Sequence, residues 1–270
     1  PFHERTAKLC LPQNWRRWAG YVVAGSYDLV LDREYWAIRD AAALIDITPL
    51  MKYIIEGPDA AKLLHRMTPR DIHKMAVGQV AYSGWCDDEG RMLDDGTISR
   101  LAEDKFRMTS AEPSLRWLAM NAIGMDVTIT EVTDKVAALS LQGPKSRAIL
   151  NRCCKKPLDK LKYFRLTENA LAGVPVTISR TGYTGDLGFE IWMDAGAALT
   201  VWDALIAAGV RVQPPCRPDR QHQVVPGVVA EVAEGRPAHP RTPVDEEHLV
   251  GDAVAIEAVL GHRLRGADDP

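Results

Sequence analysis

The sequence predicts an α+β protein made mainly of antiparallel sheets with flanking helices and divided into two related halves. Three observations support this prediction. Residues 52–65 and 137–150 share one order, an apolar strand-like run, then Gly-Pro, then an amphipathic helix. Strand-like runs separated by short turns follow each of these segments. Each half also contains a glycine-bearing hairpin with carboxylates, so we expect one functional hairpin in each half.

The first half continues with strands and a helix. Apolar runs between turn residues predict strands over 77–86, 91–101 and 105–109, with turns at 87–90 and 102–104. A helix is predicted over 113–123, with a shared apolar face formed by Leu115, Leu118 and Ile123.

The second half repeats this alternation. Strands are predicted near 125–132, 136–142, 174–181 and 188–194. A helix is predicted over about 196–208, with an apolar stripe of Leu199, Trp202, Leu205 and Ile206. Pro58 and Pro144 are expected in the first turn of their helices, where the missing N–H of proline costs nothing.

The composition is typical of a soluble globular protein. The chain has 270 residues, 46% hydrophobic and 26% charged, with a net charge of −3. No basic surface for nucleic acid, no membrane-spanning run, no signal peptide and no metal-ligand spacing is predicted. The five cysteines contain no CxxC pair, which favours reduced thiols and a cytoplasmic location.

The character of the chain changes after residue 212. All 18 Phe, Trp and Tyr residues lie within residues 1–202, while residues 213–243 carry seven prolines and no convincing periodicity. A segment without aromatic side chains is poorly suited to fill a core of its own. We therefore expect one folded region over 1–212 and a disordered or aberrant tail over 213–270.

The glycine-rich segment Arg180–Glu190 is the first candidate functional feature. Gly182, Gly185 and Gly188 permit backbone conformations that other residues resist. Tyr183 and Phe189 supply flat rings, and the carboxylate of Glu190 supplies two acceptors that match a planar donor–donor edge such as that of a pterin. Two interpretations follow, a loop that holds a flat heterocycle and an ordinary hairpin with a solvated glutamate.

The second candidate feature is the acidic hairpin around Asp94 and Asp95. Adjacent residues of a strand point to opposite faces, so one of these carboxylates is expected to face the interior or a cleft. Because Asp is disfavoured in strands, the pair requires an explanation. Asp95-Gly96 forms either a turn or bulge that bends the chain, or a positioned acid, base or ammonium-binding group.

With both hairpins identified, residues 1 to about 212 resemble the glycine cleavage T-protein family of folate-dependent aminomethyltransferases. The resemblance rests on motifs that occur in the family's order and spacing. They are Leu44-Ile-Asp-Ile-Thr-Pro, Gly57-Pro-Asp-Ala-Ala, Gly78-Gln-Val-Ala-Tyr-Ser, Gly90-Arg-Met-Leu-Asp-Asp, Leu141-Gln-Gly-Pro-Lys-Ser and Arg180–Glu190.

The resemblance implies a ring of domains around tetrahydrofolate. It implies that Asp95 lies near the folate nitrogen that accepts the one-carbon unit, and that Glu190 binds the edge of the pterin. It also implies that Tyr82 and Tyr183 line the folate site. Arg180 is expected to brace the glycine-rich loop, and Asp94 is counted with the folate-binding residues.

Departures from the family pattern accompany the resemblance. Leu50-Met-Lys52 and Thr109-Ser-Ala111 replace stretches typical of true T-proteins. The arginine-bearing helix and the C-terminal barrel expected after about residue 212 have no counterpart, and a reading-frame change near Pro215–Asp219 would account for this. A chain without these parts is expected to be inactive or of low stability.

The leading functional hypothesis is a transferase that moves a one-carbon unit from an amine donor to tetrahydrofolate. A small-molecule donor and a lipoyl-carrier protein are the expected partners, with no nucleic acid and no membrane. The alternatives are a folate-dependent demethylase of a methylated small molecule, a folate-binding protein without catalysis, and an inactive fragment.

Overall fold

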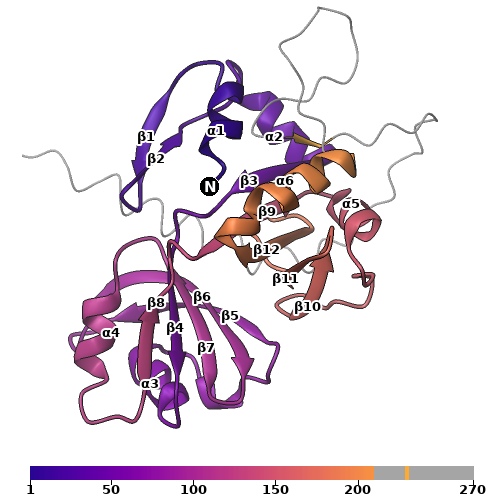
Figure 1. The fold of residues 1–270 in the computed structure, drawn as a ribbon. Helices are drawn as coiled ribbons and strands as arrows, with labels where there is room; N and C mark the ends of the chain where they lie inside the picture. Colours follow the sequence, from indigo (N-terminus) through magenta and orange to yellow (C-terminus); the bar gives the residue numbers. More distant parts are fainter. Residues whose placement is uncertain (210–228, 231–270) are drawn as a thin grey trace, which may run out of the picture. The chain divides into compact units, whose positions relative to one another are not determined.

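The computed structural model describes residues 1–209 and 229–230, all of which belong to the unit formed by residues 1–233. Two larger antiparallel sheets with flanking helices form the framework (Figure 1). This confirms the predicted α+β class. The predicted tail over 213–270 lies outside the described residues except for Val229–Ala230.

The first half folds into a five-stranded sheet in the order β5-β6-β7-β4-β8. Helices α3 and α4 cover its apolar face. The elements are β4 (Met51–Glu56), α3 (Ala60–Met67), the 3-10 helix η2 (Ile72–Lys74), β5 (Val80–Cys86), β6 (Met92–Ala102), β7 (Lys105–Ser110), α4 (Leu115–Asn121) and β8 (Thr128–Glu131).

The second half folds into a six-stranded sheet in the order β10-β11-β12-β9-β3-β13. Helices α5 and α6 cover its apolar face. The elements are β3 (Ala42–Asp46), β9 (Val136–Gln142), α5 (Ser146–Cys153), β10 (Leu166–Leu171), β11 (Val174–Ser179), β12 (Gly188–Asp194), the 3-10 helix η3 (Ala195–Ala197), α6 (Ala198–Ala207) and β13 (Val229–Ala230).

The predicted internal repeat is confirmed by the strand orders. The units β4–α3–β5–β6–β7–α4 and β9–α5–β10–β11–β12–α6 follow the same sequence of elements, and their strands are arranged as β5-β6-β7-β4 and β10-β11-β12-β9. The two candidate hairpins do not occupy equivalent places in this repeat. The acidic turn joins the unit's second and third strands, whereas the glycine-rich loop joins its third and fourth.

The N-terminal region adds elements that the sequence did not predict. Phe2 is fully buried in the core of the six-stranded sheet and stacks 5.4 Å from Trp202 of α6. The added elements are α1 (His3–Thr6), the 3-10 helix η1 (Ala7–Leu9), the hairpin of β1 (Trp15–Trp18) and β2 (Tyr21–Ala24), and α2 (Leu31–Asp40).

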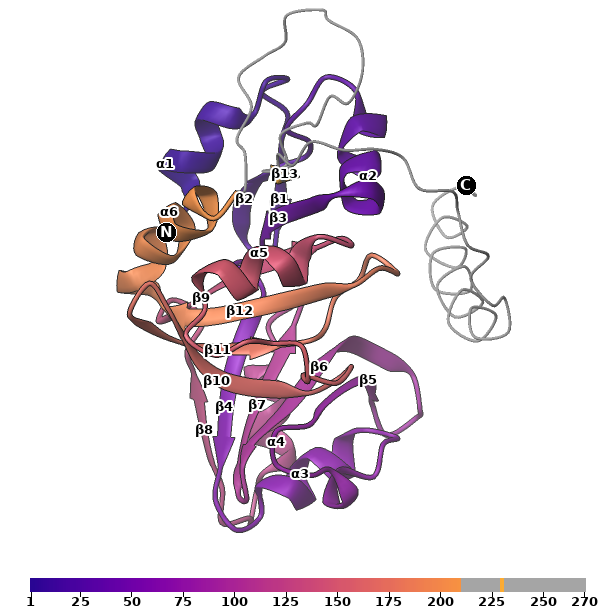
Figure 2. The same ribbon diagram turned by 90° about the vertical axis from the view of Figure 1, so that its right-hand side faces the viewer.

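The apolar face of each sheet packs against its own helices, and the polar face of each sheet lies toward the other sheet. Phe106 and Met108 of β7 lie in the core under α3 and α4, while Arg107 between them points to the opposite side. There the Arg107 guanidinium lies 3.9 Å from the ring of Trp192 in β12. Figure 2 shows the six-stranded sheet between α5 and the five-stranded sheet.

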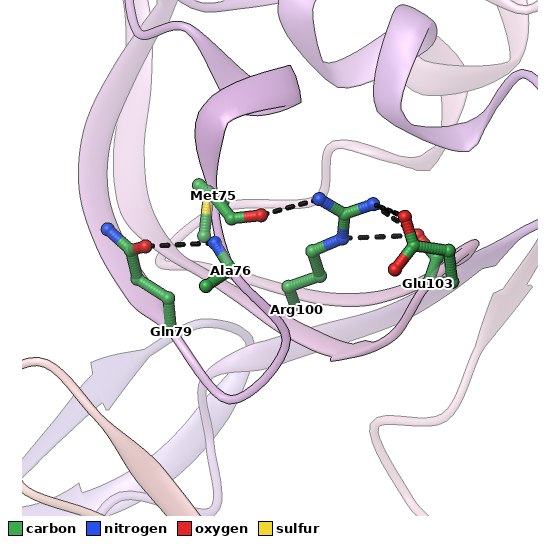
Figure 3. Close-up of polar contacts among 5 residues, drawn as sticks. All are labelled: Met75, Ala76, Gln79, Arg100 and Glu103. Atoms are coloured by element: carbon green, nitrogen blue, oxygen red, sulfur yellow. Dashed lines mark hydrogen bonds and ion pairs between the residues drawn. The ribbon is translucent and has the colours of Figure 1, made fainter.

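One junction between the sheets is made by backbone at the start of β5. The amide of Val80 donates to the Phe164 carbonyl at 2.9 Å, and the amide of Leu166 donates to the Gly78 carbonyl at 2.8 Å. The side chain of Gln79 accepts from the amide of Ala76 at 3.0 Å, which closes the loop before this junction (Figure 3).

Arg100 supports the same junction from within the five-stranded sheet. Its guanidinium donates to the carbonyl of Met75 and to the backbone and side chain of Glu103, with 2.9 Å to the carboxylate (Figure 3). Arg100 is 8% exposed, so its bond to the carbonyl of Met75 is buried, whereas the carboxylate of Glu103 is exposed. The segment before β5 is thereby fixed to the turn between β6 and β7.

A second junction is formed where the connections between the halves meet. The ammonium of Lys52 donates to the carbonyls of Thr48 at 2.7 Å, Leu50 at 2.8 Å and Thr133 at 3.4 Å. Burial lowers the pKa of Lys52 to about 8, against the opposing effect of Asp46. Lys52 is fully buried, so its three donors are used to hold together the connections β3–β4 and β8–β9.

Some predicted details are wrong. Leu115 and Ile123 do not share the buried face of Leu118, because they are 37% and 80% exposed and Leu118 is fully buried. Leu199 is 38% exposed and lies outside the buried stripe of α6. Pro58 and Pro144 precede their helices by two residues and lie in the turns that lead into them.

The interpretation of Asp95-Gly96 as a turn or bulge is also wrong. Gly96 lies inside β6, opposite Ser83, and the irregularity in this pair of strands falls at Trp85 and Cys86. A Cβ atom on Gly96 would lie 1.9 Å from the carbonyl oxygen of Thr109. The glycine therefore permits the close approach of β7.

We expect Gly96→Ala to destabilise the fold strongly, because the obstructing atom belongs to the backbone of a central strand. The expected loss of unfolding free energy is more than about 2 kcal/mol in urea denaturation. Gly84→Ala in β5 is the matched control, since the new methyl group meets mainly the flexible side chain of Met92. Equal losses in the two variants would contradict this explanation.

Candidate functional site

Two strands and one loop bring three of the predicted site residues together. The phenol of Tyr82 in β5 donates a hydrogen bond to Oδ2 of Asp95 in β6. The ring of Tyr183, from the loop between β11 and β12, meets the ring of Tyr82 edge to face at 5.5 Å. The cluster thus joins the polar faces of the two sheets.

Asp94 and Asp95 point to opposite sides, as predicted for neighbours in a strand. Asp94 is the buried one, and its two oxygens accept from the amides of Asp95 at 2.8 Å and Glu112 at 2.9 Å. Among the described residues, Tyr82 donates a hydrogen bond to the carboxylate of Asp95, at Oδ2. The other oxygen of Asp95 is available to accept a proton or a hydrogen bond from a ligand.

Tyr82 is held as a neutral phenol. Burial and the hydrogen bond to Asp95 raise its pKa to about 12. It therefore remains a hydrogen-bond donor to Asp95 at neutral pH. This bond keeps one oxygen of the Asp95 carboxylate in a fixed position.

Glu190 lies on β12 and is only 6% exposed. Its Oε2 accepts from the hydroxyls of Thr181 at 2.8 Å and Ser179 at 3.5 Å. Burial raises the pKa of Glu190, while Thr181 and the charge of Arg107 oppose this shift. Within the described part of the chain, both hydroxyls donate to Oε2, which leaves Oε1 as a free acceptor. The interpretation of Glu190 as a solvated hairpin residue is therefore wrong.

The glycine-rich loop is built around the side chain of Gln142 in β9. A Cβ atom on Gly182 or Gly188 would lie 1.9 or 1.8 Å from the amide oxygen of Gln142. The Gln142 amide donates to the carbonyl of Thr181 at 3.1 Å and accepts from the hydroxyl of Thr184 at 3.1 Å. These two glycines therefore serve close packing, and a positive φ is found at Gly185.

Arg107 contributes a buried cation beside Glu190. Burial lowers the pKa of Arg107 to about 10, and the charge of Glu190 opposes this shift. Among the described residues, Nε and Nη2 of Arg107 and Nε1 of Trp192 are buried without a hydrogen-bond partner. Such donors are rare in native interiors and point to a missing partner, either water or a ligand.

The comparison with protein families agrees with this arrangement. Residues 2–214 match the model of the GCVT N-terminal domain. The chain belongs to this family. The GCVT domain thus contains both candidate hairpins and the whole of each repeated unit, and the resemblance noted from the sequence motifs is confirmed.

Individual relatives and structures agree with the family. The aminomethyltransferases of Shouchella clausii and Halothermothrix orenii are both 34% identical, over 184 and 194 residues, or 66% and 70% of this chain. The glycine cleavage system aminomethyltransferase T from Bartonella henselae has a TM-score of 0.68 at 28% identity, covering 76% of this chain and 56% of that one.

A more distant structure shares the fold alone. The heterotetrameric sarcosine oxidase of Corynebacterium sp. U-96 has a TM-score of 0.50 at 20% identity, covering 72% of this chain and 94% of that one. This chain spans 50% and 54% of the two curated relatives above, so it represents about half their length.

Three further predicted residues of the GCVT domain make contacts other than those of the Tyr82 cluster. Arg180 donates to the carbonyl of Leu161 at 3.3 Å, outside the Tyr82 cluster. Asp94 is engaged by backbone amides, so its contact with folate stays a prediction. Phe189 is fully buried in the core and offers no ring to a ligand.

The sequence analysis of the GCVT domain missed several residues of the site. Arg107 carries a detectable signal, because it is a cation between two apolar residues of a strand, at the polar register. Gln142 also carries a signal. Its polar amide side chain ends an apolar strand, directly before the Gly-Pro of its unit. Trp192, Thr181 and Ser179 gave no signal that separates them from ordinary strand residues.

Among the residues that the structure describes, no group of three or more His, Cys, Asp or Glu side chains is arranged to hold a metal ion. No helix among these residues is long and apolar enough to cross a membrane.

We expect Glu190→Gln to raise the stability of the GCVT domain at neutral pH. The pKa of Glu190 is raised above its ordinary value of 4.5 in the fold. The folded state therefore binds more protons than the unfolded state above that value, and stability falls as the pH rises through this window. The substitution removes this loss, so the variant should melt at a higher temperature than the parent at pH 7.

Melting temperatures between pH 3.5 and 8 test this expectation. The two proteins should converge at the acidic end, where Glu190 is protonated in both states. Glu4→Gln removes an exposed carboxylate of α1 and is the control, which should show no such difference. A Glu190→Gln variant that is less stable than the parent at pH 7 would refute the assigned cause.

Proposed function

We propose that this GCVT domain binds tetrahydrofolate and takes part in the transfer of a one-carbon unit from an amine donor to it. The observation that carries the proposal is the buried carboxylate of Glu190, with one oxygen free, on the same pair of polar faces as the Tyr82–Asp95 pair. The aminomethyltransferase names of the relatives support this assignment.

The residues present fit a folate. The pterin ring of tetrahydrofolate carries adjacent N–H donors beside a carbonyl acceptor. Tetrahydrofolate also contains the nitrogen that accepts the one-carbon unit. Glu190 would accept from the donor edge, and the unpartnered nitrogens of Arg107 and Trp192 are suited to acceptor atoms of the ligand. Tyr82 and Tyr183 offer aromatic surface for the flat rings.

Asp95 would act on the charge and on the protons of the amine donor. Its carboxylate is fixed on Oδ2 by the neutral phenol of Tyr82, so Oδ1 can stabilise a positively charged amine or accept a proton from it. The buried Asp94 orients this group, because it accepts the amide hydrogen of Asp95 itself. A rigidly held carboxylate needs little reorganisation during transfer.

The donor and its carrier belong to the same proposal. An amine-bearing small molecule is the one-carbon donor, and a lipoyl-carrier protein is the partner that presents it in a glycine cleavage system. A cytoplasmic location fits these partners.

We expect Glu190→Gln to weaken the binding of 5-formyltetrahydrofolate at least tenfold, because charge-assisted hydrogen bonds are about twice as strong as neutral ones. Isothermal titration calorimetry measures this change. Glu4→Gln is again the control and should leave the affinity unaltered. Unchanged affinity in Glu190→Gln would remove this residue from the proposed folate site.

We expect Asp95→Asn to reduce one-carbon transfer at least about 100-fold while folate affinity stays within about threefold. The measurement is formation of 5,10-methylenetetrahydrofolate from tetrahydrofolate and an aminomethyl-lipoyl carrier. Asp88→Asn changes an exposed carboxylate in the same hairpin and is the control. Equal transfer by the Asp95→Asn variant would exclude Asp95 from the mechanism, and a parent chain that binds no folate would end the proposal.

A further inference from the structure

The segment from Lys145 to Arg165 is strongly basic in a chain that is acidic elsewhere. It carries eight of the 33 basic side chains of the protein but only one of the 36 acidic ones, Asp159. It comprises α5 and the connection to β10. We call it the basic segment, and its basic residues are Lys145, Arg147, Arg152, Lys155, Lys156, Lys160, Lys162 and Arg165.

None of these eight cations forms an ion pair with another described residue. The ten ion pairs of the described residues all lie elsewhere in the chain. The charge of Arg147 even contributes to a lowered pKa of Arg180, after burial. The only acidic residue of the segment, Asp159, accepts from the amide group of Asn151 at 3.2 and 3.1 Å. The positive charge of the basic segment is therefore not neutralised within the described part of the chain.

The connection after α5 is held rigidly by its neighbours. Asn169 of β10 accepts from the amide of Lys156 at 3.0 Å and donates to the carbonyl of the same residue at 2.9 Å. The amide of Lys155 donates to the carbonyl of Ala170 at 2.8 Å, and Leu158 is anchored in the core with 1% exposure. Cations displayed on such a frame lose little backbone entropy when they bind a partner.

The most exposed cations of the basic segment gather in this connection. Lys155, Lys156, Lys160 and Lys162 are all exposed, and Arg152 at the end of α5 is exposed beside them. The helix C-terminus accounts for part of this pattern, since cations near the last turn interact favourably with the helix dipole. That effect falls off within one turn, so it does not explain Lys160 and Lys162.

We propose that the basic segment is a docking surface for an acidic face of a partner protein. Charge complementarity speeds encounter and fixes orientation between proteins, and it requires unneutralised charge on a defined surface. The proposal does not depend on folate chemistry, because α5 packs on the apolar face of the six-stranded sheet, opposite the polar face that carries Glu190.

Two other polyanions fit this surface less well. A bilayer would need apolar side chains on the outer face of α5, but Ile149 and Leu150 are used in the core. A nucleic acid extends beyond one patch and would meet the acidic remainder of the chain, which holds 35 of the 36 carboxylates. A compact acidic protein surface contacts the basic segment alone.

The test uses charge reversal in the full chain. A fluorescein-labelled peptide of sixteen glutamates stands in for the acidic partner, and fluorescence anisotropy at 50 mM NaCl measures its binding. We expect the triple variant Lys155→Glu, Lys156→Glu, Lys160→Glu to lose at least about tenfold in affinity. The control triple variant Lys8→Glu, Arg16→Glu, Arg17→Glu has the same net charge and should lose less than about threefold.

Each outcome decides the matter. Melting curves first establish that both variants are folded. A loss of peptide affinity in the basic-segment variant alone supports the proposal. Equal losses of affinity in both variants would show that only net charge matters and would overturn it. A sixteen-nucleotide DNA strand or phosphatidylserine vesicles that bind more tightly than the peptide through the same three lysines would also overturn it.

Discussion

The electrostatic interaction between the buried carboxylate of Glu190 on β12 and the buried guanidinium of Arg107 on β7 is the main constraint on the polar faces of the two sheets. Both groups are moved toward their neutral forms by burial, since the pKa of Glu190 is raised and that of Arg107 is lowered to about 10. Their mutual attraction offsets this only in part, as is usual for charges taken out of water without direct pairing. Where the two polar faces meet, Nε and Nη2 of Arg107 and Nε1 of Trp192 remain without a hydrogen-bond partner among the described residues.

Two junctions hold the polar faces at a fixed separation. Backbone bonds between Gly78 and Leu166, and between Val80 and Phe164, tie the edge strands of the two sheets. At the other connection, Lys52 uses all three ammonium hydrogens on carbonyl groups of the linking segments. A ligand site between two sheets needs such fixed walls, because small displacements weaken every hydrogen bond that a ligand makes.

The sequence predicts the fold well where periodicity and turn chemistry agree. Apolar alternation that ends at clear turns predicts most of the strands correctly. These are β4, β5, β6, β7, β9, β11 and β12. Strand β10 was missed because Leu166–Leu171 contains Glu and Asn, which strands disfavour, and its stability comes from pairing with β11. The first 41 residues lack a strong period, and their order depends on tertiary contacts such as that of Phe2 with Trp202.

Site residues were predictable when a residue contradicted its local pattern. Asp95 and Glu190 are carboxylates in strands, which is unfavourable enough to require an explanation. Gly182 and Gly188 were recognised for the wrong reason, since they make room for Gln142 rather than adopt a positive φ. Spacing along the chain cannot reveal this, because Gln142 comes from β9, about 40 residues earlier in the sequence.

The hydrogen-bond inventory of the polar faces limits what can bind between them. Oε1 of Glu190 calls for a donor, whereas Nε and Nη2 of Arg107 and Nε1 of Trp192 call for acceptors. An amine cation would satisfy the carboxylate and leave the guanidinium unpaired, and a simple anion would do the reverse. A heterocycle edge with neighbouring N–H and carbonyl groups supplies both, and because it is neutral it adds no further charge to be desolvated. Under the proposed function, the buried pair would select for an amide-like ring by the cost of leaving either partner unsatisfied.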